Sequence, residues 1–421
     1  MRFSSLDLAA DIQRALDVCG YSDMTPIQEQ AIIPARRGDD ILATAQTGTG
    51  KTAAFALPVL QRMLDKPKAT IADKPRTLIL TPTRELAEQL ADAIKSYAQF
   101  TDFSVLAIYG GVKLAGQQAK LHAGVDILIA TPGRLMEHLV KCSVHLTEVE
   151  FVVLDEADRM LDMGFISDVQ ALLKKTPESR QTLLFSATTN TTINKLSRAI
   201  LKNHKVVSAS KQNATADTVE HVVFEVEERR KAELFVHLLE QENWFKVLVF
   251  TSTKEQADNL KVYLKKAKIT HGICHGDKSQ GARRRAIADF KADKIQVLIA
   301  TEVAARGLDI QGLEYVVNLN LPYLPEDYVH RIGRTGRAGE TGTAISFVSR
   351  EEERVLNNIE KLIGGYIPRQ QMTGFEVGCR DDLLDKIEAR AKPARSNKAS
   401  HTEIKATKNK RGKNQSRNKR K

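Results

Sequence analysis

Short, continuously apolar runs recur along the chain, and each is followed by a stretch with the composition of a helix. The runs are ILAT (41–44), TLIL (77–80), DILIA (126–130), FVVLDE (151–156), TLLFSAT (182–188), KVLVFT (246–251) and QVLIAT (296–301). Strands that are apolar throughout, without alternation, are typical of parallel sheets covered by helices on both faces. The pattern therefore predicts an α/β fold whose ligands bind at the carboxyl ends of parallel strands.

A break near the middle divides these units into two sets. Residues 208–218, SASKQNATADT, contain no large apolar side chain, which is typical of a linker between domains. We therefore predict two tandem sheet domains, 1–207 and 219–365, joined by this linker. A C-terminal extension (366–390) and a tail (391–421) follow them.

The tail carries the whole excess charge of the protein. The formal net charge is +11, and residues 391–421 hold twelve Lys and Arg residues against one acid, so residues 1–390 are neutral overall. A segment with so few apolar residues cannot bury a core, and we expect it to be disordered. A polyanion is the natural partner of such a tail, although a terminus that only aids solubility has the same composition.

Composition also limits the class of protein. With 42% apolar and 27% charged residues, and no run near the roughly 18 apolar residues of a membrane span, the sequence predicts a soluble enzyme. The N-terminus lacks the basic-then-apolar pattern of a secretory signal. The four cysteines form no C-x-x-C pair, which indicates neither a zinc site nor a disulfide framework. We therefore expect a cytoplasmic location and no membrane partner.

A glycine-rich segment after the first apolar run predicts a nucleotide site. Glycines let backbone N–H groups curl around phosphates, Lys51 can reach the terminal phosphates, and the Thr52 hydroxyl can hold Mg²⁺. Ala45 stands where the general phosphate-loop pattern has glycine. The predicted loop consists of Ala45, Gln46, Thr47, Gly48, Thr49, Gly50, Lys51 and Thr52.

An acidic cluster and an arginine cluster complement this loop. Asp155 and Glu156 directly follow an apolar run, where one carboxylate can hold Mg²⁺ and its neighbour can activate water. Alone, such a cluster is usually a solvated turn. The segment 330–337, HRIGRTGR, offers arginines to a phosphoryl group only if ATP lies between the two halves. This arrangement predicts closure driven by the nucleotide.

Two similar segments, TPTR (81–84) and TPGR (131–134), each follow a strand and precede a helix. Each alone would be a helix N-cap and turn, but a helix N-terminus beside an arginine also suits a backbone phosphate. Together with Gly110–Gly111, 280–283 and 301–307 they predict a path along a nucleic-acid backbone. Few aromatic residues lie near these segments, so base stacking is not supported and contact without sequence preference is.

In this combination and order, the motifs resemble those of the DEAD-box RNA helicase family, from about residue 3 to residue 348. The resemblance implies two RecA-like domains, ATP and Mg²⁺ as ligands, and RNA as partner. Residues 20–28, with Phe3 upstream, are similar to the family's Q motif, so Tyr21 would stack on adenine and Gln28 would read its edge.

The resemblance also implies roles for the remaining motifs. The catalytic group would be Lys51, Asp155, Glu156 and the arginine fingers Arg334 and Arg337, with Asp309 on the ribose. The residues that couple hydrolysis to strand separation would be Asp158, Ser186, Thr188 and His330. The RNA contacts would be Pro82, Thr83, Arg84, Gly110, Gly111, Thr131, Arg134, Thr251, Arg283, Thr301 and Gly307.

Two departures and one subgroup signal refine this picture. Tyr21 stands where the family more often has Phe, which preserves stacking, and Glu302 stands where Asp is usual after Thr301. The phrase HGDKSQGAR (275–283), with DRMLDMGF (158–165), resembles the bacterial RhlE-like subgroup.

The expected function is local, ATP-dependent unwinding of short RNA duplexes or remodelling of ribonucleoprotein by a monomer that also binds single-stranded RNA. Ribosomal RNA and pre-ribosomal particles, messenger decay and cold adaptation are all compatible contexts. Two other classes remain open: an RNA clamp that holds without unwinding, and a DNA translocase. The tail would tether RNA or recruit an acidic protein.

Overall fold

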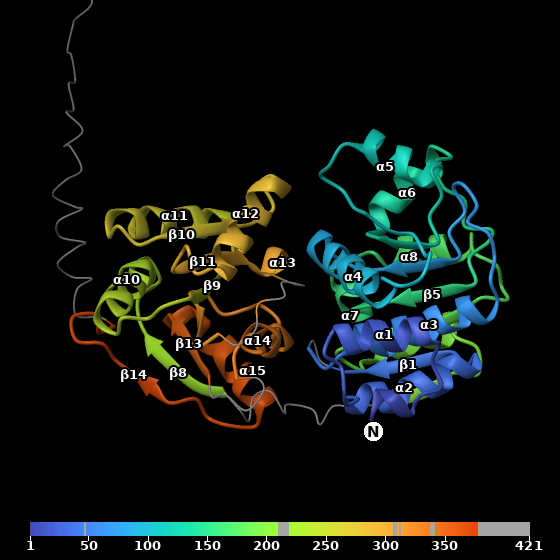
Figure 1. Cartoon of the computed structure of the whole chain (residues 1–421). Coiled ribbons are helices and arrows are strands. Elements are labelled where there is room, and N and C mark those ends of the chain that lie inside the picture. Colours follow the sequence, from blue (N-terminus) through green and yellow to red (C-terminus); the bar gives the residue numbers. More distant parts are fainter. Residues whose placement is uncertain (46–47, 209–218, 306–309, 311–312, 337–341, 378–421) are drawn as a thin grey trace, which may run out of the picture. The chain divides into compact units, whose positions relative to one another are not determined.

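The apolar runs of the sequence form two parallel sheets, one after the other along the chain (Figure 1). The computed structural model describes residues 1–45, 48–208, 219–305, 310, 313–336 and 342–377. Every pairing between the named strands of these residues is parallel. The predicted fold class, two tandem RecA-like α/β domains, is therefore confirmed.

The first sheet and its helices, called lobe 1 below, use residues up to 208. Its strands are β1 (Ile41–Thr44), β2 (Thr77–Leu80), β3 (Val105–Ile108), β4 (Ile127–Ala130), β5 (Phe151–Leu154), β6 (Gln181–Ser186) and β7 (Lys205–Ser208). Its helices are η1 (Phe3–Ser5), α1 (Ala10–Val18), α2 (Pro26–Arg37), α3 (Lys51–Asp65), α4 (Arg84–Tyr97), α5 (Leu114–His122), α6 (Pro132–Val140), α7 (Ala157–Asp162), α8 (Ile166–Leu173) and α9 (Thr191–Ile200). The strand order across the sheet is β3-β4-β2-β5-β6-β1-β7.

The second sheet and its helices, called lobe 2, use residues from 219 onward. Its strands are β8 (Val219–Glu225), β9 (Val247–Thr251), β10 (His271–Cys274), β11 (Val297–Thr301), β12 (Tyr315–Asn318), β13 (Gly342–Val348) and β14 (Arg369–Gln370). Its helices are η3 (Glu228–Arg230), α10 (Lys231–Gln241), α11 (Lys254–Lys266), α12 (Gln280–Lys291), α13 (Glu302–Ala305), α14 (Pro325–Ile332), η4 (Arg350–Glu352) and α15 (Glu353–Ile363). The order β10-β11-β9-β12-β13-β8-β14 repeats that of lobe 1, strand for strand.

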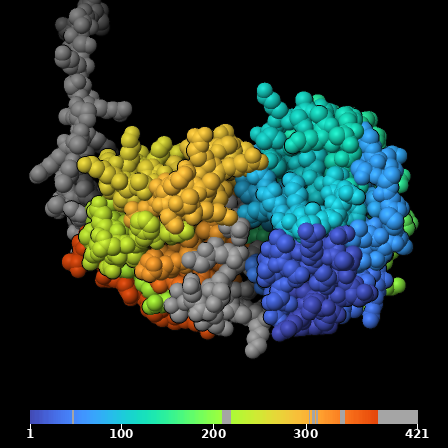
Figure 2. Space-filling model, in the orientation of Figure 1, coloured from blue at the N-terminus to red at the C-terminus, as the bar shows by residue number. Residues whose placement is uncertain are grey.

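Each sheet is buried on both faces, which explains why its strands lack polar alternation. In lobe 1, Ile41 and Ala43 face the core under α2, α3 and α4, whereas Leu42 between them faces the core under α6, α8 and α9. Lobe 2 repeats this with Val247 and Val249 on one face and Leu248 on the other. In the space-filling view the colours pass in order through each lobe, because each is built from one continuous stretch of chain (Figure 2).

Several predicted features lie outside the described residues. They are Gln46, Thr47, Gly307, Asp309, Arg337, residues 209–218 of the linker, residues 378–390 of the extension and the tail 391–421. Within the described ranges, no helix is both long and apolar enough to pass through a membrane. The domain boundaries at 207, 219 and 365 stay predictions, and Ile367 and Phe375, beyond the last of them, are buried in the cores of lobe 2.

Candidate functional site

The predicted site residues of lobe 1 lie at the carboxyl edge of its sheet and divide into two groups. Segments assigned to nucleotide or hydrolysis follow β1, β5 and β6, which are neighbours in the order β5-β6-β1. Segments assigned to RNA follow β3, β4 and β2, which are neighbours on the other side of β5. Because parallel strands end at one edge, the chain brings each group together although its members are far apart in sequence.

The phosphate loop begins as a continuation of the sheet and ends as a helix N-terminus. The buried Ala45 donates its N–H to Ser186 O at 3.0 Å. Gly50, with φ +88°, precedes the first residue of α3, and a Cβ there would lie 2.3 Å from Gln28 Nε2. Gln28 in turn donates from Nε2 to Gly50 O at 3.0 Å. Glycine is therefore required at this position by both conformation and space.

Lys51 opens α3 and is the most informative side chain of this loop. It is 6% exposed, and its Nζ has no hydrogen-bond partner among the residues that the structure describes. The nearest opposite charge is Asp155 Oδ1, at 4.0 Å. Buried ammonium groups are normally paired and hydrogen-bonded, so this arrangement is ready to accept an anionic ligand.

The acidic cluster turns the chain sharply at the end of β5. Asp155 is 3% exposed and its Oδ1 accepts a bond from Glu156 N at 3.0 Å. Burial raises the pKa of Asp155 to about 6, while Lys51 opposes this shift. Glu156 adopts the left-handed conformation, with φ +53°, which for such a residue costs roughly 1–3 kcal/mol. A strained backbone directly after a buried carboxylate is typical of a functional turn.

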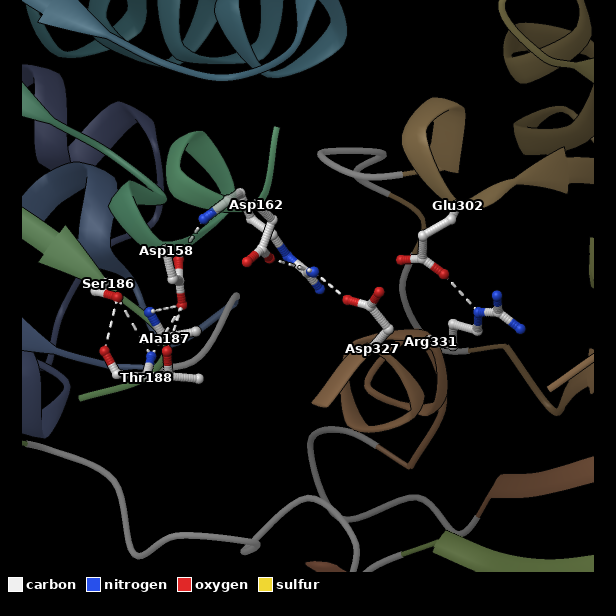
Figure 3. A network of polar contacts seen from close by, with 9 residues as sticks. Asp158, Asp162, Ser186, Ala187, Thr188, Glu302, Asp327 and Arg331 are labelled. Atoms are coloured by element: carbon white, nitrogen blue, oxygen red, sulfur yellow. Dashed lines mark hydrogen bonds and ion pairs between the residues drawn. The ribbon is translucent and has the colours of Figure 1, made fainter. Parts of the chain in front are cut away.

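Asp158 joins the acidic cluster to the end of β6 (Figure 3). Its Oδ2 accepts bonds from Ala187 N at 2.9 Å, Thr188 N at 2.9 Å and Thr188 Oγ1 at 3.2 Å. Ser186 Oγ donates to Thr188 O at 2.8 Å. One carboxylate thus ties the start of α7 to residues 187 and 188, which follow β6.

Of the residues that the sequence assigns to the adenine base, Tyr21 precedes α2 and Gln28 lies in the first turn of that helix. Tyr21 is 39% exposed, and its ring centroid lies 5.9 Å from those of Phe3 and Tyr97. Its hydroxyl is 3.2 Å from the Tyr97 hydroxyl, a partner that phenylalanine would lack. Gln28 is buried, and its Oε1 accepts a bond from Thr25 N at 2.8 Å. The base-side residues are therefore held in place by protein contacts.

In lobe 2, an arginine and the unusual Glu302 form a buried pair. Arg331 Nε donates to Glu302 Oε2 at 2.5 Å, and Arg331 Nη1 donates to Asn320 O at 2.7 Å (Figure 3). Its guanidinium also lies 5.0 Å from the Phe250 ring centroid. Arg331 therefore supports α13 and α14 within lobe 2. His330 and the buried Arg334, from the same segment, line a pocket together with Glu156.

Among the predicted RNA contacts, Arg84 and Gly111 lie against each other. Gly111 has φ +81°, a conformation that favours glycine, and a Cβ there would lie 1.9 Å from Arg84 Nη1, so a side chain would displace that guanidinium. Gly110 precedes it, and Pro82 and the helix cap Thr83 lead into α4, where Thr83 Oγ1 accepts from Leu86 N at 3.3 Å. This cluster presents a cation beside a helix N-terminus, which suits a phosphate.

Other predicted RNA contacts are already engaged by the protein. Arg134 is 9% exposed and donates to Val112 O at 3.1 Å and to Gln117 Oε1 at 2.8 Å. Thr131 is its buried neighbour at the start of α6. In lobe 2, Thr251 and Thr301 are register partners on β9 and β11. Their roles as RNA contacts stay predictions.

Contacts between the lobes include residues that the sequence did not single out. Glu85, beside Arg84, accepts from Arg283 Nη2 at 2.9 Å and from Gln280 Nε2 at 3.1 Å. Arg159, beside Asp158, pairs with Asp327. No local sequence pattern predicts an ion pair between residues 168 positions apart. The only available signal was that Arg159 directly follows the acidic tetrad and Asp327 stands three residues before His330.

Two family models and several known proteins match this chain in sequence. The family model described as DEAD/DEAH box helicase matches residues 25–196, and the helicase conserved C-terminal domain matches residues 230–339. The ATP-dependent RNA helicase RhlB of Pseudomonas aeruginosa is 42% identical over 368 residues, which cover 86% of this chain and 93% of that relative. The DEAD-box ATP-dependent RNA helicase CshA of Bacillus subtilis is 39% identical over 85% of this chain and 72% of its own length.

Solved structures of proteins bound to RNA also align with this chain. S. cerevisiae Dbp5 bound to RNA and ADP BeF3 aligns with a TM-score of 0.79 and 29% identity, over 92% of this chain and 99% of that one. Mss116p bound to single-stranded RNA and AMP-PNP aligns with a TM-score of 0.78 and 28% identity, over 88% and 79% of the two chains. No finding tests the RhlE-like subgroup, which stays a prediction.

Proposed function

The chain belongs to the DEAD-box family of ATP-dependent RNA helicases, and we propose from that membership how its residues hydrolyse ATP and use the reaction to separate short RNA duplexes. The observation that supports the assignment most directly is the buried Lys51 ammonium, which lies beside the buried Asp155 and has no hydrogen-bond partner in the described ranges. The reaction is ATP + H2O to ADP and phosphate.

In this proposal, ATP occupies the carboxyl ends of β1, β5 and β6. Tyr21 stacks on the adenine and Gln28 binds its edge. The loop Ala45, Gln46, Thr47, Gly48, Thr49 and Gly50 surrounds the phosphates, and Lys51 neutralises their charge. Glu156 orients the attacking water and takes its proton.

The residues present also fit a magnesium ion. The Thr52 hydroxyl and the Asp155 carboxylate are oxygen ligands of the kind that Mg²⁺ prefers, and both border the loop. A cation there would offset the effect of burial, which raises the pKa of Asp155. When bound, Mg²⁺ would neutralise charge on the phosphates.

Lobe 2 completes the site. Arg334 and Arg337 stabilise charge on the γ-phosphate, and Asp309 binds the ribose. The pocket that Glu156 shares with His330 and Arg334 supports this role for Arg334. Asp158, Ser186, Thr188 and His330 would transmit the state of the nucleotide to the RNA path, since Asp158 already ties α7 to residues 186–188.

RNA would follow the other half of the sheet edges, in contact with its backbone and without sequence preference. The proposed contacts are Pro82, Thr83, Arg84, Gly110, Gly111, Thr131 and Arg134 in lobe 1, and Thr251, Arg283, Thr301 and Gly307 in lobe 2. Closure of the lobes would bend one strand and separate a short duplex, and hydrolysis would then release it.

We further propose a monomer in the cytoplasm, with ribosomal RNA or pre-ribosomal particles among its partners. The net charge of +11 on the tail supports a salt-sensitive tether to RNA. Deletion of 391–421 should weaken RNA affinity at low salt and leave the RNA-free hydrolysis rate unchanged. If RNA affinity is unchanged, the tail does not tether RNA, and an acidic protein becomes its expected partner.

Steady-state ATP hydrolysis tests the proposed function directly. We would measure it without nucleic acid, with single-stranded RNA and with DNA of the same sequence, alongside Lys51→Ala. Stimulation by RNA only, lost in the variant, is expected. Equal stimulation by DNA would indicate a DNA translocase instead.

Glu156→Gln separates a helicase from an RNA clamp. A helicase variant that binds ATP but cannot hydrolyse it should form a long-lived RNA complex with little turnover and no repeated unwinding. A protein whose work is clamping would lose little function in cells with the same substitution.

A further inference from the structure

One buried ion pair joins the acidic cluster of lobe 1 to the arginine-bearing segment of lobe 2. Arg159 Nη1 pairs with Asp327 Oδ1, and the side chains are only 4% and 8% exposed (Figure 3). Arg159 lies in α7, whose N-cap is Glu156, and Asp327 lies in α14. Asp327 precedes His330 by one helical turn, and Arg334 follows shortly after α14 ends.

We propose that Arg159 and Asp327 are positioning residues that hold α14 against α7, so that Arg334 stands at the reacting phosphate only when the lobes are closed. The inference rests on the proposed function, because it assigns a task to closure that the proposed reaction requires. Neither residue needs to touch ATP for this role.

Burial gives the pair its influence. Two charges removed from water attract each other strongly, but either one alone is costly to bury. Arg159 and Asp327 therefore favour the closed lobes only as a pair. With one partner removed, the closed lobes would bury the other charge without the partner that closure supplies, and the closed state would lose much of its population.

The structure also supplies Arg159 with a partner inside lobe 1. Asp162, one turn further along α7, accepts from Arg159 Nη1 at 3.3 Å. When the lobes are open, Asp162 can therefore still pair with the Arg159 guanidinium. The Asp327 contact is the one that depends on closure, which makes the pair specific for the RNA-stimulated step.

A second contact between the lobes serves as a control. Arg284 donates from Nε to Glu88 Oε2 at 2.9 Å and from Nη2 to the Tyr109 hydroxyl at 2.5 Å, but its side chain is 54% exposed. Exposed pairs contribute little and are screened by salt. Comparing both pairs separates an effect of burial from a general effect of any charge between the lobes.

The test is a charge-reversal cycle with Arg159→Asp, Asp327→Arg and the double swap. Each single reversal should lower the RNA-stimulated kcat by about tenfold or more, and the swap should recover most of the loss. The dissociation constant of a fluorescent ADP and the RNA-free rate should stay within about twofold of the wild type, because neither substitution touches the phosphate loop, Tyr21 or Gln28, which hold most of the nucleotide in lobe 1. Arg284→Glu should change the rate by about twofold or less, and only at low salt.

Neutral variants guard against misfolding, since a reversed charge in a buried site can disrupt a lobe. Arg159→Gln and Asp327→Asn, with melting curves like the wild type, should show the same loss of RNA-stimulated kcat and non-additive effects in the double variant. Asp327→Glu should retain most of the rate.

Three results would overturn the inference. Wild-type rates in folded single variants would mean that the pair does not position α14. A loss confined to Arg159 variants, without rescue by the swap, would mean that Arg159 acts alone. If the wild type itself shows no stimulation by RNA, both the proposed function and this inference are wrong. If RNA stimulates the wild type and Lys51→Ala abolishes the stimulation, the proposed function holds, and the Arg159 and Asp327 variants then test the inference alone.

Discussion

The two lobes share one sheet order, yet a lysine at the same place in each has opposite surroundings. Lys51 is the first residue of α3, after β1, and Lys231 is the first residue of α10, after the corresponding strand β8. Both are buried. Within the described part of the chain, Lys51 Nζ has no hydrogen-bond partner, whereas Lys231 Nζ pairs with Glu352 and, at 2.6 Å, with Glu228.

The difference lies in the segment between strand and helix. Lobe 1 has a glycine-rich loop there, in which Gly48 and Gly50 adopt positive φ angles, and a loop of this kind can turn backbone N–H groups toward an anion. Lobe 2 has residues 226–230, VEERR, which contain no glycine and provide the carboxylate of Glu228. A common fold is thus set by buried strands, and chemistry is set by a few residues at their ends.

The largest expected effect comes from Lys51→Met. Without the ammonium, the charge of the terminal phosphates is not neutralised, and we expect RNA-stimulated hydrolysis to fall about a hundredfold or more. Melting temperature should stay close to that of the wild type, because Lys51 Nζ has no hydrogen bond among the described residues and its ion pair with Asp155 is long, at 4.0 Å. Steady-state hydrolysis and thermal unfolding check this. A lysine that served folding would instead show a lowered melting temperature.

Lys231→Met makes the same substitution at the matching place in lobe 2 and should act on stability. It leaves the carboxylates of Glu228 and Glu352 without their cation, which should cost about 1–3 kcal/mol of unfolding free energy. Denaturant unfolding followed by Trp244, buried in lobe 2, measures this loss. Hydrolysis per folded molecule should stay near the wild type. A loss of turnover as large as that of Lys51→Met would contradict the comparison.

The sequence was sufficient for what depends on local pattern. Apolar runs located β2 and β9 to within a residue, because central strands are buried on both faces. The apolar runs named from the sequence did not include β3, β8, β10, β12 and β13. They also missed β7, whose Lys205 and Val206 are exposed at an edge, and β14, which has two residues. Edge strands lack the two buried faces that produce a continuous apolar run.

For the site, motifs identified Lys51 and Asp155 because their chemistry depends on neighbours in sequence. Partners across the fold were beyond reach. Nothing near Lys231 indicates that Glu352, 121 residues away, neutralises it. Likewise, Arg134 looks like a phosphate ligand in TPGR, but its hydrogen bonds to Val112 and Gln117 depend on the tertiary structure.

A smaller effect is expected where the two lobes tie neighbouring strands together. In lobe 1 the charged Asp158 links α7, after β5, to residues 187–188, after β6. In lobe 2 the neutral Asn318 Nδ2 donates to Ser346 Oγ at 3.1 Å between β12 and β13. Asp158→Asn should lower duplex unwinding per ATP hydrolysed by about three- to tenfold, because the asparagine amide keeps one acceptor oxygen and has a donor in place of the other.

Ser346→Ala is the matched variant in lobe 2, because it removes the acceptor of this bond and leaves the bond from Arg331 Nη1 to Asn318 Oδ1 in place. It should cost about 1 kcal/mol of stability and leave unwinding per ATP unchanged. Paired unwinding and hydrolysis assays provide the ratio for both variants. Equal ratios in Asp158→Asn and the wild type would remove Asp158 from the coupling path.

The smallest effect concerns acid stability, in which the lobes should behave alike. Burial alone would raise the pKa of Glu150 in lobe 1 and of Glu360 in lobe 2, but Arg76 and Arg369 outweigh burial and hold each pKa below its ordinary value of 4.5. A lowered pKa in the folded state adds stability that is fully present above pH 4.5 and is lost as pH falls through the folded pKa.

Glu150→Gln and Glu360→Gln should therefore each be less stable than the wild type at pH 7, by an amount that shrinks as pH falls below 4.5. Thermal unfolding between pH 3 and 7 measures the difference, with Glu353→Gln as the control, since its pair with Arg369 at 3.4 Å is half exposed. A matching acid response would show that such pairs serve structure in both lobes. A response confined to one lobe would mean that the asymmetry between the lobes extends beyond the ends of their strands.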